Sequence, residues 1–263
     1  MNHTIEIANE RTASLMHFYD ALAPSYDTMT SFPKRFVQER PFFHVLVERF
    51  RIRTAIDAGC GTGFHSILLA QLGVHVTAVD VSSQMLKEVE RHAADLHVSI
   101  KRVESTFQEL QSHVWGEFDA LFCMGNSLAH VLDQQELKLS FKNFFSVLKP
   151  GGALFLQSLN YDRIMMKRER VQSIKESGET TFVRFYDYDE DAVLFNILTI
   201  NRTNNGAKQT LNTIRLRPIL RNELVLLLEE AGFVSVNVYG GISLEDFQPE
   251  VSKDLVVLAR KPE

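Results

Sequence analysis

The sequence predicts an α/β protein built on a Rossmann-like seven-stranded sheet, mostly parallel with an antiparallel last strand and helices on both faces. Three observations lead to this prediction. Apolar strand patterns alternate with helical patterns from residue 52 to residue 158, as in right-handed βαβ units. A turn with glycines at 59, 61 and 63 joins the first strand to its helix. Extended segments at 181–217 then interrupt the alternation and predict a small inserted antiparallel sheet.

The expected elements follow in a regular order. Residues 12–29 form an amphipathic segment broken at Pro24, and residues 33–51 form a helix. Ser82 can cap a helix, and Pro150-Gly151-Gly152 must end one. Gly232 occupies a C-cap position. Strands are expected at 52–57, 74–79, 97–104, 118–123, 153–158, 233–239 and 253–260, and helices at 64–72, 82–94, 134–148 and 221–231.

The element order divides the chain into three parts. Residues 1–51 form an N-terminal helical cap, and residues 52–180 and 218–263 form the core. Residues 181–217 form the inserted sheet, with turns at Asp189–Asp191 and Asn204-Asn205-Gly206. Insertions of this kind often serve as lids, so we expect this one to cover the substrate.

Composition excludes several function classes. The chain has 263 residues, 45% of them hydrophobic, and a net charge of −5 with no basic stripe, so nucleic acid is not an expected partner. No apolar run is long enough for a membrane span, and residues 1–20 lack the features of a signal peptide. Cys60 and Cys123 fit a reduced, cytoplasmic protein. No metal-binding spacing occurs, so no metal is expected. A homo-oligomer stays open.

The most informative stretch is IDAGCGTGFHSILLA, from Ile56 to Ala70. An apolar strand ends at Asp57, glycines follow at alternate positions from 59, and an apolar helix comes next. Glycine adopts left-handed dihedral angles and leaves no side chain between a ligand and the backbone. The start of a helix also presents unpaired N–H groups. The turn therefore predicts a cofactor site.

Two nucleotide cofactors compete for this turn. Counted from Gly59, the dinucleotide fingerprint G-x-G-x-x-G needs a glycine at position 64, which is Phe64. The spacing is D-x-G-x-G-x-G instead, which resembles the first motif of class I S-adenosylmethionine-dependent methyltransferases. Asp80, at the end of the run VHVTAVD, offers a carboxylate to ribose hydroxyls and fits either cofactor. A tight turn without a ligand is the remaining alternative.

Five segments follow the expected strands, and each adds residues to the same region. A doubly wound sheet binds its ligand outside the carboxyl ends of its strands. These segments should therefore converge at one edge, and their convergence is better evidence than any single motif. They are DAGCGTG (57–63), DVSSQM (80–85), ESTF (104–107), CMGNSLAH (123–130) and QSLNYD (157–162).

Longer segments narrow the resemblance to one group of methyltransferases. The segments FDALFCMGNSLAHV (118–131), VTAVDVSSQML (76–86) and NFFSVLKPGG (143–152) are similar to the glycine N-methyltransferase and sarcosine methyltransferase group. The triplet Asn160-Tyr161-Asp162 is similar to the same group. The resemblance covers 52–165 well and the insertion more loosely.

This resemblance implies S-adenosylmethionine as cofactor, S-adenosylhomocysteine as product, and a small-molecule methyl acceptor. The glycines would border the methionine part, Asp80 the ribose, and Val81 and Met85 the adenine. The group usually has an acidic residue where Thr106 stands, so no side-chain contact to adenine is expected there. The cofactor residues implied are Tyr26, Asp57, Gly59, Gly61, Gly63, Asp80, Val81, Met85, Thr106, Phe107, Met124, Gly125 and Asn126.

The acceptor is where the sequence departs from the group. In its amino-acid methyltransferases an arginine commonly precedes the Asn-Tyr-Asp triplet and binds the substrate carboxylate, and here that position is Leu159. An isobutyl group cannot replace a guanidinium, so glycine is not the expected substrate. The candidates for substrate contacts are Asn160, Arg163, Arg184 and Arg217.

Transfer to a nitrogen or an oxygen needs an acceptor that has lost its proton. His130 and Tyr161 are the catalytic candidates, with Asp162 as a further base. The leading hypothesis is therefore a methyltransferase acting on a nitrogen or oxygen of a small molecule. A cofactor-binding regulatory or partner protein without transfer activity is the alternative, and a dehydrogenase ranks third because of Phe64.

Overall fold

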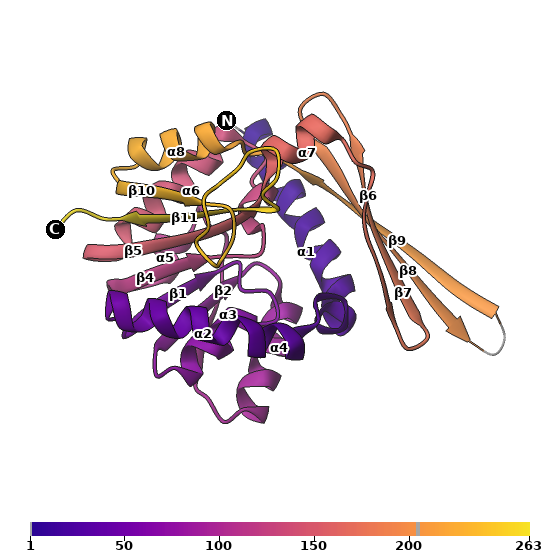
Figure 1. Cartoon of the computed structure of the whole chain (residues 1–263), viewed down its shortest axis with the longest axis horizontal. Helices are drawn as coiled ribbons and strands as arrows, with labels where there is room; N and C mark the ends of the chain where they lie inside the picture. The colour runs from indigo at the N-terminus through magenta and orange to yellow at the C-terminus, as the bar shows by residue number, and fades with distance from the viewer. Residues whose placement is uncertain (1, 204–205) are drawn as a thin grey trace.

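Alternating apolar strands and amphipathic helices build the predicted sheet. The computed structural model describes residues 2–203 and 206–263, with side chains from residue 10 onward. Its central sheet has seven strands in the order β10-β11-β5-β4-β1-β2-β3 (Figure 1). The strands are β1 Thr54–Ala58, β2 His75–Asp80, β3 Ile100–Glu104, β4 Phe118–Cys123, β5 Leu148–Leu159, β10 Val234–Tyr239 and β11 Asp254–Arg260.

Strand direction confirms the predicted topology. The pairs β1–β2, β1–β4, β2–β3 and β4–β5 are all parallel. Strand β11 is antiparallel to both of its neighbours, β5 and β10. The carboxyl ends of β1 to β5 therefore meet at one edge of the sheet, where a doubly wound fold binds its ligand.

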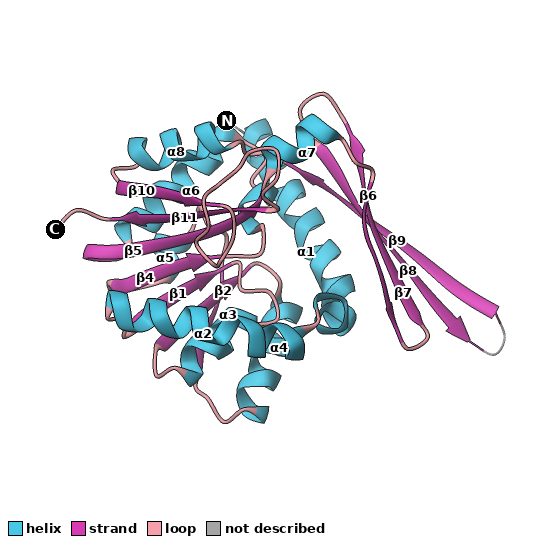
Figure 2. Cartoon of the chain, in the orientation of Figure 1, coloured by secondary structure: helices cyan, strands magenta, loops and turns pink. Residues whose placement is uncertain are grey.

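Helices cover both faces of the sheet (Figure 2). On one face α2 (Phe32–Phe50) and α3 (Phe64–Gln71) bury a core with Phe43 and Leu68. On the other, α5 (Leu110–His113), α6 (Gln134–Ser146) and α8 (Arg221–Glu230) bury a core with Phe141, Phe144 and Leu228. Helix α4 (Ser83–Asp95) begins at its predicted cap, because the Ser82 Oγ accepts a hydrogen bond from the Met85 N–H at 3.0 Å. No helix in the described part of the chain is long and apolar enough to cross a membrane.

Two sequence expectations about element ends are wrong. Helix α1 runs from Asn2 to Thr30 and continues through Pro24 without a break. Its neighbours Leu22 and Ala23 are buried, and this packing outweighs the hydrogen bond that proline cannot make. Helix α6 stops at Ser146, before the Pro-Gly-Gly turn, because β5 already begins at Leu148, which pairs with Phe118.

The inserted sheet is larger than predicted. It has four antiparallel strands, β6 Val171–Ser177, β7 Thr180–Tyr188, β8 Val193–Thr203 and β9 Gly206–Leu216. The insertion therefore begins at residue 171, not 181. Strand β6 was missed because it lies at the sheet edge, where Val171 and Ile174 are exposed and no clean alternation marks a buried face. The predicted turn at 204–205 lies outside the described residues.

Helix α1 lies between the core and the inserted sheet, as both cartoons show (Figure 1). Its apolar side chains Phe18 and Leu22 pack with Phe182, Tyr186 and Ile197 of the insertion in one buried cluster. Lys175 on β6 also donates to the main-chain carbonyls of Thr28 and Met29, near the end of α1. The helix is thus attached to the insertion along one side and at its carboxyl end.

Candidate functional site

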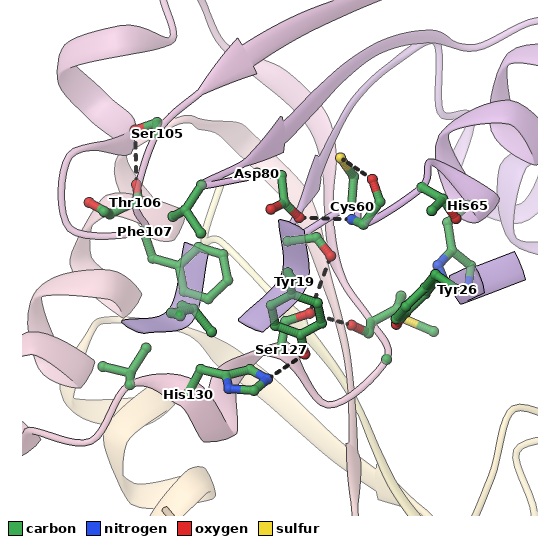
Figure 3. Close-up of a pocket in the computed structure, with 18 of the residues that line it drawn as sticks. Tyr19, Tyr26, Cys60, His65, Asp80, Ser105, Thr106, Phe107, Ser127 and His130 are labelled. Atoms are coloured by element: carbon green, nitrogen blue, oxygen red, sulfur yellow. Dashed lines mark hydrogen bonds between the residues drawn. The ribbon is translucent and has the colours of Figure 1, made fainter. Parts of the chain in front are cut away.

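A cavity lies at the carboxyl ends of the strands, beneath α1 (Figure 3). Segments far apart in the sequence meet there, as predicted from the strand ends. The wall includes Gly59, Gly61, Asp80, Val81, Thr106, Phe107, Met124 and Gly125, all expected from the sequence, and the roof includes Leu15, Tyr19, Tyr26 and Thr30. Arg11, Thr12, Gln108, Val131 and Glu136 line it as well.

Four N–H groups of the glycine turn are paired within the protein. Those of residues 59 and 60 both donate to the Val79 carbonyl, at 2.8 and 3.0 Å. The Gly61 N–H donates to Asp80 Oδ2 at 2.8 Å, and the Gly63 N–H donates to the Cys60 carbonyl at 3.0 Å. A pyrophosphate needs such donors free. The turn is therefore unsuited to a dinucleotide, which agrees with the missing glycine at Phe64.

Asp57 faces the start of α3 and does not line the cavity. The structure therefore gives no support to the cofactor contact expected from the sequence. The Ser66 hydroxyl donates to Asp57 Oδ2 at 2.6 Å, and the Ser66 N–H also bonds this carboxylate. Burial raises the pKa of Asp57 even though these bonds and His65 oppose the rise. The carboxylate satisfies N–H groups that the helix start would otherwise leave open.

Two of the three glycines are required by close packing. A Cβ at Gly59 would lie 2.7 Å from Ser127, and a Cβ at Gly63 would lie 2.9 Å from Val89 on α4. Gly63 therefore allows α3 and α4 to pack, and it is absent from the cavity wall. A Cβ at Gly61 would point toward Tyr26 at 3.8 Å, on the open side of the turn.

Asp80 is the acid at the centre of the cavity. Its Oδ2 accepts from the Gly61 N–H and its Oδ1 from the Ser82 N–H at 2.9 Å. The Val81 N–H also bonds this carboxylate. A carboxylate has about four lone-pair sites, so capacity remains for ligand hydroxyls. Burial raises the pKa of Asp80 to about 6, although the backbone hydrogen bonds from Ser82, Gly61 and Val81 lower it. The group is ionised at neutral pH and becomes protonated in mild acid.

Val81, Thr106 and Phe107 form one end of the cavity, with Ser105 beside them (Figure 3). The Phe107 ring meets Phe144 edge-to-face, with centroids 5.3 Å apart. The Thr106 hydroxyl donates to Glu109 Oε2 at 3.2 Å, so it is engaged within its own loop. Met85 was expected beside the adenine, yet it is fully buried in the core and is absent from the cavity wall.

Tyr19 and His130 meet across the cavity (Figure 3). The Tyr19 hydroxyl and His130 Nε2 are 2.6 Å apart, and the two rings are in edge-to-face contact. Burial lowers the pKa of His130 to about 4, so the imidazole is neutral at pH 7. Its Nδ1 is buried and has no protein hydrogen-bond partner among the described residues. The sequence singled out His130 as a catalytic candidate.

Asn126 and Tyr161 come from the two most selective sequence motifs, and the structure joins them away from the cavity. The Asn126 amide donates to the Tyr161 hydroxyl at 3.0 Å, and its Oδ1 accepts from the Ser158 hydroxyl and the Leu159 N–H. Tyr161 has no exposed surface, and burial raises its pKa well above the usual value. Neither residue lines the cavity. Both instead hold the ends of β4 and β5 together.

The other two residues of the triplet also have structural partners. Asn160 caps α7 (Tyr161–Lys167), because its Oδ1 accepts from the Arg163 N–H at 3.1 Å. Its amide donates to the carbonyls of Pro249 and Ser252, each at 2.9 Å. Asp162 accepts from the Arg221 N–H at 2.9 Å, at the start of α8. Neither Asn160 nor Asp162 lines the cavity.

None of the three candidate arginines lines the cavity. Arg217 donates to Glu223 at 2.5 Å and to the Leu132 carbonyl. The Arg184 Nε donates to Ser173 at 2.7 Å within the inserted sheet. Arg163 lies 3.9 Å from Glu169, and its Nε is buried without a partner among the described residues. None of these three candidates therefore reaches the cavity, whereas Arg11 and Arg35 do line it.

Arg35 and His65 line the opposite end of the cavity, and the sequence did not predict Arg35 there. The Arg35 guanidinium lies 4.2 Å from the centroid of the Phe64 ring and donates to Glu39 at 2.7 Å. Arginine has five N–H donors, so the rest can meet a ligand carboxylate. Since Arg35 precedes the recognisable motifs, only its place on a predicted helix could have indicated it.

One group in the described part of the chain brings three metal-type ligands within 4.8 Å of one another, namely Asp27, Glu88 and His92. These side chains are engaged with protein partners. Asp27 accepts from the Thr62 hydroxyl at 2.7 Å, and Glu88 pairs with Arg91 at 2.8 Å. We assign this group no metal.

Comparisons of sequence and structure relate this chain to known methyltransferases. A family model described as "Methyltransferase domain" matches residues 55–152. A glycine/sarcosine N-methyltransferase from Aphanothece halophytica is 26% identical over 249 residues, which cover 90% of this chain and 85% of that protein. A glycine N-methyltransferase from Homo sapiens is 36% identical over 133 residues, which cover 46% of this chain and 45% of that protein.

The fold has solved counterparts. The crystal structure of an S-adenosylmethionine-dependent methyltransferase from Clostridium acetobutylicum superposes with a TM-score of 0.79. The match covers 93% of this chain and 99% of that one, at 18% sequence identity. At this identity the similarity shows the fold alone, over nearly the whole chain.

Proposed function

This chain belongs to the class I S-adenosylmethionine-dependent methyltransferases, and from that premise we propose that it methylates a nitrogen of a small molecule other than glycine. The observation that carries the proposal is one cavity in which Gly59, Asp80 and Phe107 meet under Tyr19 and Tyr26. The choice of nitrogen over oxygen is supported by the relatives, whose names are those of N-methyltransferases.

The residues present fit the cofactor. Gly61 and Tyr26 leave the methionine end uncrowded, and Arg35 can pair with the methionine carboxylate. Asp80 has lone pairs left for the two ribose hydroxyls, and Phe107 offers a ring to adenine. The paired N–H groups of the turn suit a ligand without phosphates. The cofactor supplies an electrophilic methyl group, so the protein has to hold an acceptor in line at about 3 Å.

We assign His130 the role of orienting the acceptor and receiving its proton. Its ring is neutral at pH 7, which a base must be. In the tautomer that can take up a proton, Nε2–H donates to the Tyr19 oxygen, which fixes the ring, and the unpartnered Nδ1 keeps the lone pair that receives the proton. The Tyr161 hydroxyl, which the sequence also suggested, is bonded to Asn126 and buried. The low pKa of His130 makes it a weak base, so its effect depends on position more than on basicity.

We expect His130→Asn to lower kcat by about 10²-fold while S-adenosylhomocysteine affinity changes less than about threefold. The reason is that His130 faces the acceptor whereas Asp80 and the turn hold the cofactor. Because the pKa of His130 is about 4, the wild-type kcat should show no titration from this group between pH 6 and 8. Steady-state kinetics and calorimetry would measure both. His113→Asn, an exposed histidine outside the cavity, is the control, and wild-type kcat in His130→Asn would refute the assignment.

Glycine should not be turned over at a physiological rate, because Leu159 stands where the related amino-acid methyltransferases have an arginine, and neither Arg163, Arg184 nor Arg217 lines the cavity. Leu159 packs with Tyr161 and Phe18 in the cluster under the insertion. A panel of primary and secondary amines, amino acids and phenols, assayed for S-adenosylhomocysteine release, would test this expectation. Turnover of amines that lack a carboxylate supports the proposal. Rapid glycine methylation contradicts it, and release with phenols alone would replace nitrogen by oxygen.

Binding separates this function from its alternatives. Calorimetry should show micromolar or tighter S-adenosylhomocysteine binding and no NAD binding. Binding of NAD would reinstate a dehydrogenase. Cofactor binding without turnover of any acceptor in the panel would favour a regulatory or partner protein.

A further inference from the structure

We propose that Asp27 and His92 are positioning residues that hold α1 closed over the cofactor cavity. The inference rests on the proposed function, because it concerns how the same cavity is kept closed. It adds two residues that neither line the cavity nor belong to any motif recognised in the sequence.

Asp27 connects α1, which forms the roof of the cavity, to the glycine turn. It follows Tyr26, whose ring lies over Gly61 on the cavity side. On the other side of α1, Asp27 Oδ1 accepts from the Thr62 hydroxyl at 2.7 Å, and Thr62 is the next residue of the glycine turn. Tyr26 and Asp27 therefore contact two consecutive residues of that turn. A shift of Asp27 would move the Tyr26 ring as well.

His92 on α4 contacts both Asp27 and Thr62 through its two ring nitrogens. Nδ1 lies 2.8 Å from the Thr62 carbonyl, and Nε2 lies 2.8 Å from Asp27 Oδ2. The doubly protonated ring donates both bonds at once, whereas the neutral Nδ1–H tautomer keeps the bond to Thr62, loses the one to Asp27, and accepts at Nε2 from Arg91 Nη2, which lies 2.8 Å away. His92 is 8% exposed, so water replaces these bonds poorly. One imidazolium thus binds α1 and the turn together.

The groups around His92 come from three helices. Asp27 approaches from α1, while Arg91 and Glu88 lie on α4. The uncharged Phe32 ring of α2 lies 4.7 Å away between centroids. Burial and Arg91 oppose the charge on His92, but the bonds to Asp27 and Thr62 outweigh them and raise its pKa above 6.5. At Asp27 the hydrogen bonds from His92 and the Thr62 hydroxyl, with the nearby positive charges, outweigh burial and lower the pKa of that carboxyl.

A second hydrogen bond joins α1 to the loop that follows β2. Asp20, on the same helix, accepts from the Ser82 hydroxyl at 2.5 Å. Ser82 follows the loop that carries Asp80, and its N–H donates to that carboxylate. Acidic residues of α1 thus reach both loops that border the cofactor. Only the Asp27 contact includes a group that titrates near neutral pH, which makes it the one to test.

The test is the pH dependence of S-adenosylhomocysteine affinity, measured by calorimetry from pH 6 to 8.5. Wild-type affinity should fall roughly three- to tenfold as His92 loses its proton, because the charged hydrogen bonds are lost. His92→Gln should bind more weakly at pH 6.5 and lose this alkaline decline. Asp27→Asn should behave alike, and the double variant should add little. The ligand's own titration is common to all variants and cancels in the comparison.

His75→Gln is the matched control, because His75 is an exposed histidine at the start of β2. It should keep the wild-type profile. Thermal unfolding of each variant shows whether it is folded. A folded His92→Gln that keeps the wild-type affinity and alkaline decline overturns the inference. Loss of the decline on adding a chelator also overturns it, since the three nearby ligand groups would then hold a metal. Failure of the wild-type protein to bind S-adenosylhomocysteine would instead overturn the proposed function.

Discussion

Replacing Asp80 by asparagine is expected to weaken S-adenosylhomocysteine binding by about 10²- to 10³-fold, since two hydrogen bonds to a charged acceptor are lost. In the wild-type protein, affinity should also fall as pH drops below about 6, where the carboxyl becomes protonated. The pH dependence of this decline should correspond to the uptake of a single proton. Calorimetry between pH 5 and 8 measures both effects. An unchanged affinity in Asp80→Asn would show that ribose is bound elsewhere.

The same substitution should have little effect on the stability of the ligand-free protein. The folded pKa of Asp80, about 6, lies above the ordinary aspartate value of 3.8. A raised carboxyl pKa means that folding favours the protonated form, so this group's contribution to stability is greatest below pH 4 and declines up to about pH 6. At neutral pH its burial costs on the order of 3 kcal/mol. Asp80→Asn removes that cost while disturbing one backbone bond, so the free energy of unfolding should change little.

A thermal-shift experiment makes this separation visible. Wild-type protein should gain on the order of 4 kcal/mol from ligand at 1,000 times its dissociation constant, whereas Asp80→Asn should gain only about 0.4–1.4 kcal/mol at that concentration. A variant that unfolds at much lower temperature without ligand would mean that Asp80 supports the loop more than it binds ribose.

Replacing Gly59 by alanine is expected to abolish cofactor binding and to destabilise the fold by about 2–4 kcal/mol. The backbone at Gly59 has φ +71°, which costs a residue with a side chain about 1–2 kcal/mol. The new Cβ would also lie 2.7 Å from both Cβ and Oγ of Ser127 and 3.2 Å from Phe107. Relieving these contacts moves two parts of the cavity wall. Denaturant unfolding and calorimetry measure the two outcomes.

Gly73 offers a matched control within the same chain. It has φ +85°, yet a Cβ there would meet nothing within 4 Å. Gly73→Ala therefore carries the backbone cost without the contacts, and it should keep full cofactor affinity. Equal stability losses in the two variants would show that the contacts at Gly59 are relieved at no cost. Cofactor binding by Gly59→Ala would show that the turn is not a close approach to the ligand.

The sheet could be predicted because periodicity and turn chemistry report on local backbone. Strand β4 was placed correctly from Phe118 to Cys123, and Ser82 was recognised as a cap. Strand β6 was missed since an edge strand shows little alternation. The continuity of α1 through Pro24 depends on packing against the insertion, which no local pattern shows.

The cavity was predictable where strand ends define it, and less so elsewhere. Asp80, Phe107 and Gly125 follow parallel strands, so topology alone brings them together. Asn126 and Asn160 attracted attention through a family resemblance, but both hold loops in place. Sequence alone cannot distinguish an asparagine that binds a ligand from one whose side chain hydrogen-bonds to loop backbone, because both roles use the same amide group. The partners of Asp27 lie 35 and 65 residues away and could not have been guessed.

The place of α1 has a consequence for how the protein is made. This helix is synthesised well before the insertion, yet the side chains that bury its outer face belong to residues 182–216. A contact between such distant segments forms late in folding, because a long loop must close before it. During synthesis, residues 10–30 therefore emerge with an unburied apolar face and wait until most of the chain has been translated. A truncated chain that ends before residue 182 would contain every motif of the cofactor cavity and still lack the surface that holds its roof.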